Sequence, residues 1–181
     1  MFTLPCIGMF YHDVAALLKN AKYVAVIYVK INPEFNIYLD QDENVVALEC
    51  LNADAKDAYG KKSFAGKSLD ETLQTVVSIA AEKGYMKEDQ MVALTITECT
   101  TDLNATELQM KMDSVVTEAA KEQNITVTTA MDMSEEVRMA QKEAGLIKQA
   151  CSNCNGTGDC PDCPVCGGSF KCVVCGGSGT L

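Results

Sequence analysis

The sequence AKYVAVIYVKINPEFNIYLDQDENVVALECLN, residues 21–52, decides how the rest of the chain folds. Its early part, residues 24–31, is a nearly continuous apolar run rich in β-branched side chains. Such a run is typical of a strand that is covered on both faces. The pair Asn32 and Pro33 then interrupts it, because proline has no N–H to donate and restricts the preceding residue to extended geometry. We therefore expect the chain to jog or bulge at this pair.

The segments that follow predict a sheet covered by helices. Apolar and polar residues alternate over 34–40 and 45–51, which is the pattern of an antiparallel hairpin. Helical spacing recurs over 68–83 and 105–122, and each helix is followed by a further strand. The fold class is therefore α+β, with a single mixed or antiparallel sheet and the helices packed on one face. The side chains expected to be buried are Val26, Ile37, Leu48, Leu73, Val77, Leu94, Val115 and Val116.

Local signals set the ends of these helices. Residues 68–71, Ser-Leu-Asp-Glu, form a capping box, and Gly84 suits the C′ position beyond the helix. A third helix is predicted over 134–148, with Ser134 as its N-cap. The segment 53–67 has glycines among lysines and alanines, and we interpret it as a loop or a ragged turn of helix without visible chemistry.

Composition excludes some partners and divides the chain. The net charge of −10 and the single arginine, Arg138, argue against nucleic acid as a partner. We divide the chain into three parts. The first, residues 1–21, has an apolar start and a short predicted helix. The second, residues 22–148, is the α+β domain, and the third, residues 149–181, is a cysteine-rich module. The apolar start is shorter than the roughly 20 residues of a membrane helix. We expect the chain as given to be soluble, with a membrane link only through a segment missing from it. The apolar start is either the remnant of such a segment or an element packed on the core.

Order and spacing along the chain carry a family resemblance. The tripeptide at 31–33 follows a Val/Ile strand, and Leu-Asn-Ala-Asp stands at 51–54 after the acidic turn. Gly-Lys-Ser-Leu at 66–69 and Glu-Lys-Gly-Tyr at 82–85 then flank a helix. In this order the chain resembles the domain just outside the membrane in RsgI-type anti-sigma factors, over about residues 22–97 and more weakly to 147.

The resemblance implies an unusual reaction at the bond between Asn32 and Pro33, which is a site of self-cleavage in that family. Because proline supplies no N–H, the usual backbone attack that deamidates asparagine is closed. Attack by the Asn32 side-chain nitrogen on its own carbonyl remains, and it would release Pro33 as a new N-terminus. The flanking residues depart from the family pattern, which usually has Asp where this chain has Lys30 and Ser where it has Glu34. The alternative is that the Asn32–Pro33 pair forms only a bend between two strands and is not cleaved.

Composition changes abruptly at residue 151. Seven of the ten cysteines lie in the last 31 residues, spaced C-x2-C-x5-C-x2-C-x2-C-x5-C-x2-C. Paired C-x2-C knuckles in a segment too short for a core favour zinc over disulfides, which would leave one cysteine unpaired. Residues 151–158 and 172–179 resemble the CxxCxGxG repeats of the DnaJ cysteine-rich zinc domain. That resemblance implies a first zinc held by Cys151, Cys154, Cys172 and Cys175.

A second zinc site is incomplete in the sequence. The inner cysteines number three rather than four, so a second ion needs Asp159, Asp162, a water or a bridging thiolate. The three inner candidates are Cys160, Cys163 and Cys166.

Two function classes fit these observations. One is a non-catalytic signalling or interaction module like the ectodomain of an RsgI-type anti-sigma factor, with a zinc-stabilised docking tail and a protein partner. The other is a zinc-dependent, chaperone-like or thiol-active factor that handles client polypeptides. The first implies the outer face of a membrane, whereas reduced zinc thiolates favour the cytoplasm. We prefer the first because its resemblance covers more of the chain. No conventional enzyme motif occurs, so self-cleavage is the one activity we consider.

Overall fold

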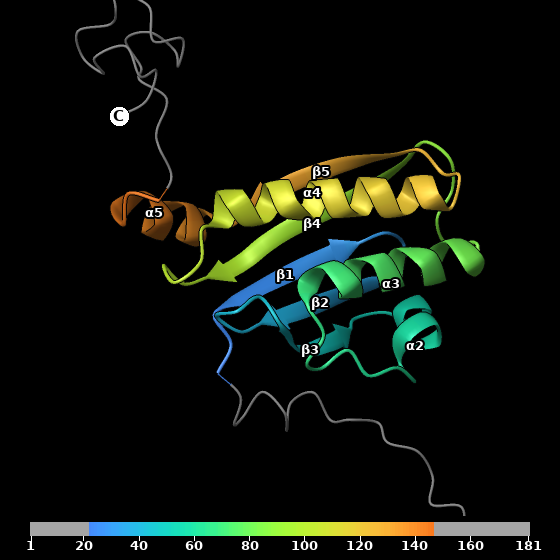
Figure 1. Ribbon diagram of the computed structural model, residues 1–181, viewed down its shortest axis with the longest axis horizontal. Coiled ribbons are helices and arrows are strands. Elements are labelled where there is room, and N and C mark those ends of the chain that lie inside the picture. Colours follow the sequence, from blue (N-terminus) through green and yellow to red (C-terminus); the bar gives the residue numbers. More distant parts are fainter. Residues whose placement is uncertain (1–21, 147–181) are drawn as a thin grey trace, which may run out of the picture.

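The computed structural model describes residues 22–146 (Figure 1). The β1–β2–β3 meander comes first, and the helices and remaining strands follow it in the chain. The elements are β1 (Ala25–Lys30), β2 (Glu34–Leu39), β3 (Val45–Cys50), α2 (Ala53–Tyr59), α3 (Leu69–Glu82), β4 (Gln90–Cys99), α4 (Ala105–Glu122), β5 (Val127–Met133) and α5 (Glu135–Glu143).

The strands form one five-stranded mixed sheet in the order β3-β2-β1-β4-β5. All neighbours are antiparallel except β4 and β5, which are parallel and are connected through α4. The first of the described strands, β1, therefore lies at the centre of the sheet and pairs on both sides. Its continuous apolar run agrees with this central position, because both of its faces are shielded.

Helices α3 and α4 lie side by side over one face of the sheet (Figure 1). Side chains such as Ile37, Leu73 and Leu94 are fully buried between the layers. This arrangement confirms the α+β fold and the single helical layer. The predicted burial is wrong in part, because Leu48 and Val115 are only half-buried. Leu48 lies on the edge strand β3, which has a neighbouring strand on one side only.

The boundaries of two segments differ from the prediction. The segment expected as a loop or ragged turn contains a regular helix, α2, whose N-cap is Asn52. The third helix, predicted over 134–148, ends at Glu143 because Gly145 adopts a positive φ of 72°. Its predicted N-cap is confirmed, since the Ser134 side chain accepts from the Val137 N–H.

Three helices end in the same way. After α3, the N–H of Tyr85 donates to the Ala80 oxygen at 2.8 Å, while Gly84 has a φ of 75°. This is a Schellman motif, and it confirms the predicted C′ role of Gly84. The C-terminus of α4 repeats it with Asn124 in the left-handed region, and α5 repeats it with Gly145.

The opposite face of the sheet carries polar and aromatic side chains. The Tyr38 hydroxyl donates to the Glu49 carboxylate at 2.8 Å, and the Asn36 amide donates to the same oxygen at 3.2 Å. Tyr23 packs edge-on against Tyr38. Val26 is also on this face and is buried, although it is outside the main core. Burial and the neighbouring carboxylate raise the pKa of Tyr38 to about 12.

Helix α5 is attached to the rest of the domain through a buried polar residue. Gln141 is fully buried, and its amide bonds to the connection between β4 and α4. It donates to the oxygen of Thr100 at 3.0 Å and accepts from the N–H of Ala105 at 3.0 Å. Figure 1 shows α5 beside the end of the sheet where this connection lies.

Two predicted parts of the chain lie outside the described residues. These are the N-terminal segment 1–21 and the cysteine-rich module 149–181. The domain boundary expected near residue 148 stays a prediction for the same reason. Within residues 22–146, no helix is both long and apolar enough to cross a membrane.

Candidate functional site

The bond between Asn32 and Pro33 lies in a tight turn that joins β1 to β2. Lys30 and Glu34 are directly paired across the two strands, so residues 31–33 alone reverse the chain. The N–H of Ile31 donates to the oxygen of Pro33 at 3.1 Å. All peptide bonds within residues 22–146 are trans, and Asn32 is not in the left-handed region. The expected bend is confirmed, at the end of the sheet where α2 and β4 begin.

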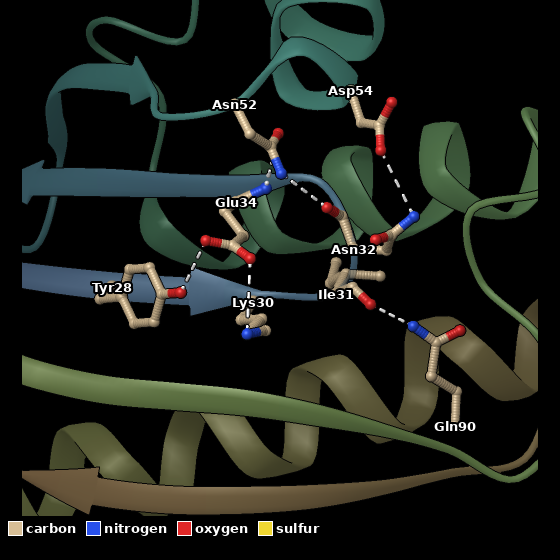
Figure 2. A network of polar contacts seen from close by, with 8 residues as sticks. All are labelled: Tyr28, Lys30, Ile31, Asn32, Glu34, Asn52, Asp54 and Gln90. Atoms are coloured by element: carbon tan, nitrogen blue, oxygen red, sulfur yellow. Dashed lines mark hydrogen bonds and ion pairs between the residues drawn. The ribbon is translucent and has the colours of Figure 1, made fainter.

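Asn52 holds this turn from the start of α2. Its side-chain oxygen accepts from the N–H of Ala55 at 2.8 Å and from the N–H of Glu34 at 3.2 Å. Two backbone donors on one atom fix that atom as the amide oxygen. The amide nitrogen therefore faces the main-chain oxygen of Asn32, to which it donates at 2.9 Å (Figure 2).

The side chain of Asn32 points toward a carboxylate. Its amide nitrogen lies 3.4 Å from Oδ2 of Asp54, the second residue of α2. Figure 2 shows the two polar groups of Asn32 directed at different residues, the carbonyl at Asn52 and the amide at Asp54. Asn32 is exposed, whereas the neighbouring Ile31 and Pro33 are buried and anchor the turn. The carbonyl and amide of one residue are thus contacted from a single short helix.

A third contact comes from β4. The side-chain amide of Gln90, the first residue of that strand, donates to the main-chain oxygen of Ile31 (Figure 2). The turn is therefore held on one side by Asn52 and on the other by Gln90. A turn held at two successive carbonyl groups has little freedom to change its backbone conformation.

The two residues that flank the turn, Lys30 and Glu34, contact each other. Lys30 Nζ lies 3.5 Å from Glu34 Oε1, and the Tyr28 hydroxyl donates to Glu34 Oε2 at 3.0 Å. Burial and then the Glu34 carboxylate raise the pKa of Tyr28. The side chains of Lys30 and Glu34 are both partly exposed to solvent, so the ion pair between them adds little stability. Tyr28, Lys30 and Glu34 thus form a small network of their own beside the turn.

The described residues 22–146 contain no candidate metal site. Within residues 22–146, no group of three or more His, Cys, Asp or Glu side chains is arranged to hold a metal ion. Cys50 and Cys99 are free thiols. Burial raises the pKa of Cys99 to about 11. All seven cysteines proposed as zinc ligands lie outside the described residues.

Sequence reasoning identified Asn32 and Pro33 but missed the residues that surround them. Asp54 lies in the segment 53–67, to which we assigned no chemistry, Asn52 directly precedes that segment, and Gln90 is the first residue of a strand. An asparagine just before an alanine-rich segment is a recognisable N-cap signal. The contact with Asn32 gives no such signal, because it joins residues 20 positions apart.

Comparison with known proteins gives two findings. The model of the anti-sigma factor RsgI-like central domain matches residues 24–151. The chain is also similar to the anti-sigma-I factor RsgI of Bacillus anthracis, with 29% identity over 75 residues. That match covers 41% of this chain and 17% of the relative's length. The family model spans well over half of the chain, including the whole described sheet. The chain therefore belongs to the RsgI-like anti-sigma factor family, through the central domain of that family.

Proposed function

We propose that this protein is the extracytoplasmic part of an RsgI-type signalling system and that it cuts itself between Asn32 and Pro33. Family membership supports the regulatory role. The relative is named an anti-sigma-I factor, so the pathway would end at a sigma factor, and the partners of this chain would be proteins. The acidic net charge of −10 agrees with a protein partner rather than nucleic acid.

The observation that carries the self-cleavage proposal is the position of the bond. Asn32 is exposed in a held turn, and its carbonyl oxygen accepts from a side-chain amide rather than from the strand ladder. The Asn32 amide nitrogen can close a five-membered ring on the Asn32 carbonyl carbon. Pro33 is the leaving group, and its tertiary amide has no N–H that attacks the Asn32 side chain in competition.

The sheet explains how the cut protein would stay together. Cleavage would leave β1 on one fragment and every other described element on the second fragment. Because β1 pairs with β2 and β4, both of its edges are hydrogen-bonded to the second fragment. Ile27 and Val29 are buried in the core, and their transfer to water costs about 1.5–3 kcal/mol each. The two fragments would therefore remain one particle under native conditions.

Mass spectrometry under denaturing conditions tests the cleavage. We expect two fragments, the second beginning at Pro33. Their masses should sum to the mass of the intact chain, and hydrolysis of the cyclic imide then adds the mass of one water molecule to the first fragment. Under native conditions the same sample should elute from a sizing column as one species. The variant Asn32→Ala removes the attacking nitrogen and should stay intact. An intact wild-type chain after prolonged incubation contradicts the proposal, and so does cleavage of Asn32→Ala at the same bond.

We also propose a zinc-stabilised docking tail in residues 149–181. The support is the spacing of its seven cysteines, which the described domain does not test. The first ion would be held by Cys151, Cys154, Cys172 and Cys175, and the three inner cysteines are candidates for a second. In this arrangement the tail would fold on metal binding, independently of the sheet domain.

A further inference from the structure

We propose that Asn52 and Asp54 are catalytic residues of this cleavage, Asn52 as the donor that stabilises the oxyanion and Asp54 as the base. The assignment rests on the self-cleavage proposed above. It comes from contacts on the two reacting groups of Asn32, which are its carbonyl and its side-chain amide. Both contacts come from the N-terminal end of α2, where Asn52 is the N-cap and Asp54 lies in the first turn.

Asn52 is placed to stabilise negative charge on the Asn32 oxygen. When the ring nitrogen attacks, the carbonyl carbon becomes tetrahedral and its oxygen becomes an oxyanion. The Asn52 amide nitrogen already lies 2.9 Å from that oxygen, within the range of an effective oxyanion donor. A hydrogen bond to a charged acceptor is about twice as strong as one to a neutral acceptor, so this bond strengthens as the reaction proceeds.

The same side chain cannot turn away at low cost. Its oxygen caps α2 through Ala55 and also accepts from the Glu34 N–H, so rotation of the amide would break three hydrogen bonds. The helix is itself anchored, because Ala58 and Tyr59 are buried and the Tyr59 hydroxyl donates to the oxygen of Val76 at 3.0 Å. The donor is therefore preorganised before any charge develops.

Asp54 supplies the proton acceptor that an amide nucleophile needs. The lone pair of an amide nitrogen is delocalised into its carbonyl, so the Asn32 amide attacks well only as it loses a proton. Oδ2 of Asp54 lies 3.4 Å from that nitrogen. Contacts of this kind are often long before reaction and tighten in the transition state.

The reaction balances without water, metal or an oxidant. A bond forms between Nδ2 and the carbonyl carbon of Asn32, and the bond between that carbon and the Pro33 nitrogen breaks. Nδ2 gives one proton to Asp54, which releases it to solvent, and the Pro33 nitrogen takes one proton from solvent, so no net proton is gained or lost. The products are a cyclic imide at residue 32 and a free secondary amine at residue 33.

The test for Asn52 is the variant Asn52→Asp. It keeps an oxygen for the Ala55 and Glu34 N–H groups but removes the donor to Asn32. We expect the cleavage rate to fall by about 100- to 1,000-fold, the cost of losing one oxyanion donor. Rates are measured on the full chain in a cell-free synthesis reaction, after translation is stopped. The matched control is Asn104→Asp, because Asn104 caps α4 in the same way, through the N–H groups of Thr106 and Glu107.

The test for Asp54 is Asp54→Asn, which should slow cleavage by about 100-fold or more, since the base is lost. Its matched control is Asp57→Asn, which lies one turn later on α2 and contacts Lys83 instead. Both control variants should be cut at the wild-type rate.

Each outcome decides between the two proposals. A wild-type rate in Asn52→Asp and Asp54→Asn overturns this assignment and leaves self-cleavage standing, provided that Asn32→Ala stays intact. A wild-type chain that is never cut overturns both proposals. To separate chemistry from folding, thermal unfolding is compared in the Asn32→Ala background, where no chain is cut. Two double variants are compared, Asn32→Ala with Asn52→Asp and Asn32→Ala with Asn104→Asp. Equal unfolding temperatures support the assignment. Loss of the folded state in the Asn52→Asp double variant, with the Asn104→Asp double variant still folded, overturns it.

Discussion

Gln141 donates from its side-chain amide to the main-chain oxygen of Leu103 at 2.8 Å, although 38 positions separate the two residues. The same amide group also bonds to Thr100 and Ala105, and the Gln141 side chain has no exposed surface. A buried amide with partners for both its oxygen and its nitrogen specifies one position for α5 against the β4–α4 connection.

Replacement of this glutamine should destabilise the domain. In Gln141→Leu the volume is nearly kept, but the Ala105 N–H and the oxygens of Thr100 and Leu103 lose a buried partner. Because each of these three losses costs about 1–3 kcal/mol, we expect the free energy of unfolding to fall by about 3 kcal/mol or more. Urea unfolding measures it. Gln74→Leu, on the exposed side of α3, is the control and should change little. A similar midpoint for both variants would refute the role of Gln141.

The sequence predicted the parts of this fold that depend on local periodicity. The spacing of Leu73 and Val77 predicts the buried stripe of α3, and alternation around Ile37 predicts the hairpin. The role of Gln141 could not be predicted, since its partners lie 36 or more residues away and nothing local distinguishes it from a surface glutamine. The same limit applies to Asn52, whose capping role is local but whose contact with Asn32 is not.

The C-terminus of α4 should be open to stabilisation. Asn124 takes a φ of 59° at the C′ position, where glycine has no steric penalty. Asn124→Gly should therefore raise the free energy of unfolding by up to about 1 kcal/mol. The reciprocal change after α3, Gly84→Asn, should lower it by a similar amount. Thermal unfolding of the pair gives the answer, and shifts of the same sign in both variants would show that the left-handed geometry does not control these sites.

Alkaline pH should reveal the cost of ionising Tyr38. Its pKa is raised to about 12 in the folded chain, above the usual 10, because burial and Glu49 disfavour the phenolate. Because folding raises this pKa, keeping Tyr38 un-ionised contributes to the stability of the folded chain. That contribution is complete below pH 10 and is lost as the pH rises from about 10 to 12.

The variant Tyr38→Phe removes that titration. It should be slightly less stable than the wild type at neutral pH, because the bond to Glu49 is lost, yet it should lose less stability between pH 10 and 12. Denaturant unfolding at both pH values, together with ultraviolet titration of the phenolates, measures the effect. Tyr23→Phe keeps the bond from Tyr38 to Glu49 and serves as the control. Parallel loss of stability in wild type and Tyr38→Phe would exclude Tyr38 as the cause.

Removal of metal should affect the tail alone. We expect the purified, reduced chain to hold at least one zinc, and a chelator to remove it without changing the unfolding of the sheet domain, which has its own hydrophobic core. Cys151→Ser should lower the zinc content, whereas Cys50→Ser should not, because Cys50 lies on β3 and contacts the Ala55 oxygen. Metal analysis that finds little zinc before and after reconstitution would refute the site.

The central position of β1 also sets an order of events during synthesis. This strand leaves the ribosome before any other described strand, but one of its two edges stays unpaired until β4 has been made. Gln90, which bonds to the oxygen of Ile31, is translated 59 residues after it. Because domains are made from the N-terminus, a growing chain has the turn at Asn32 long before it has the last of the three side-chain contacts to that turn, the one from Gln90. The structure thus delays completion of this site until most of the domain exists, so that a truncated chain lacks the assembled turn.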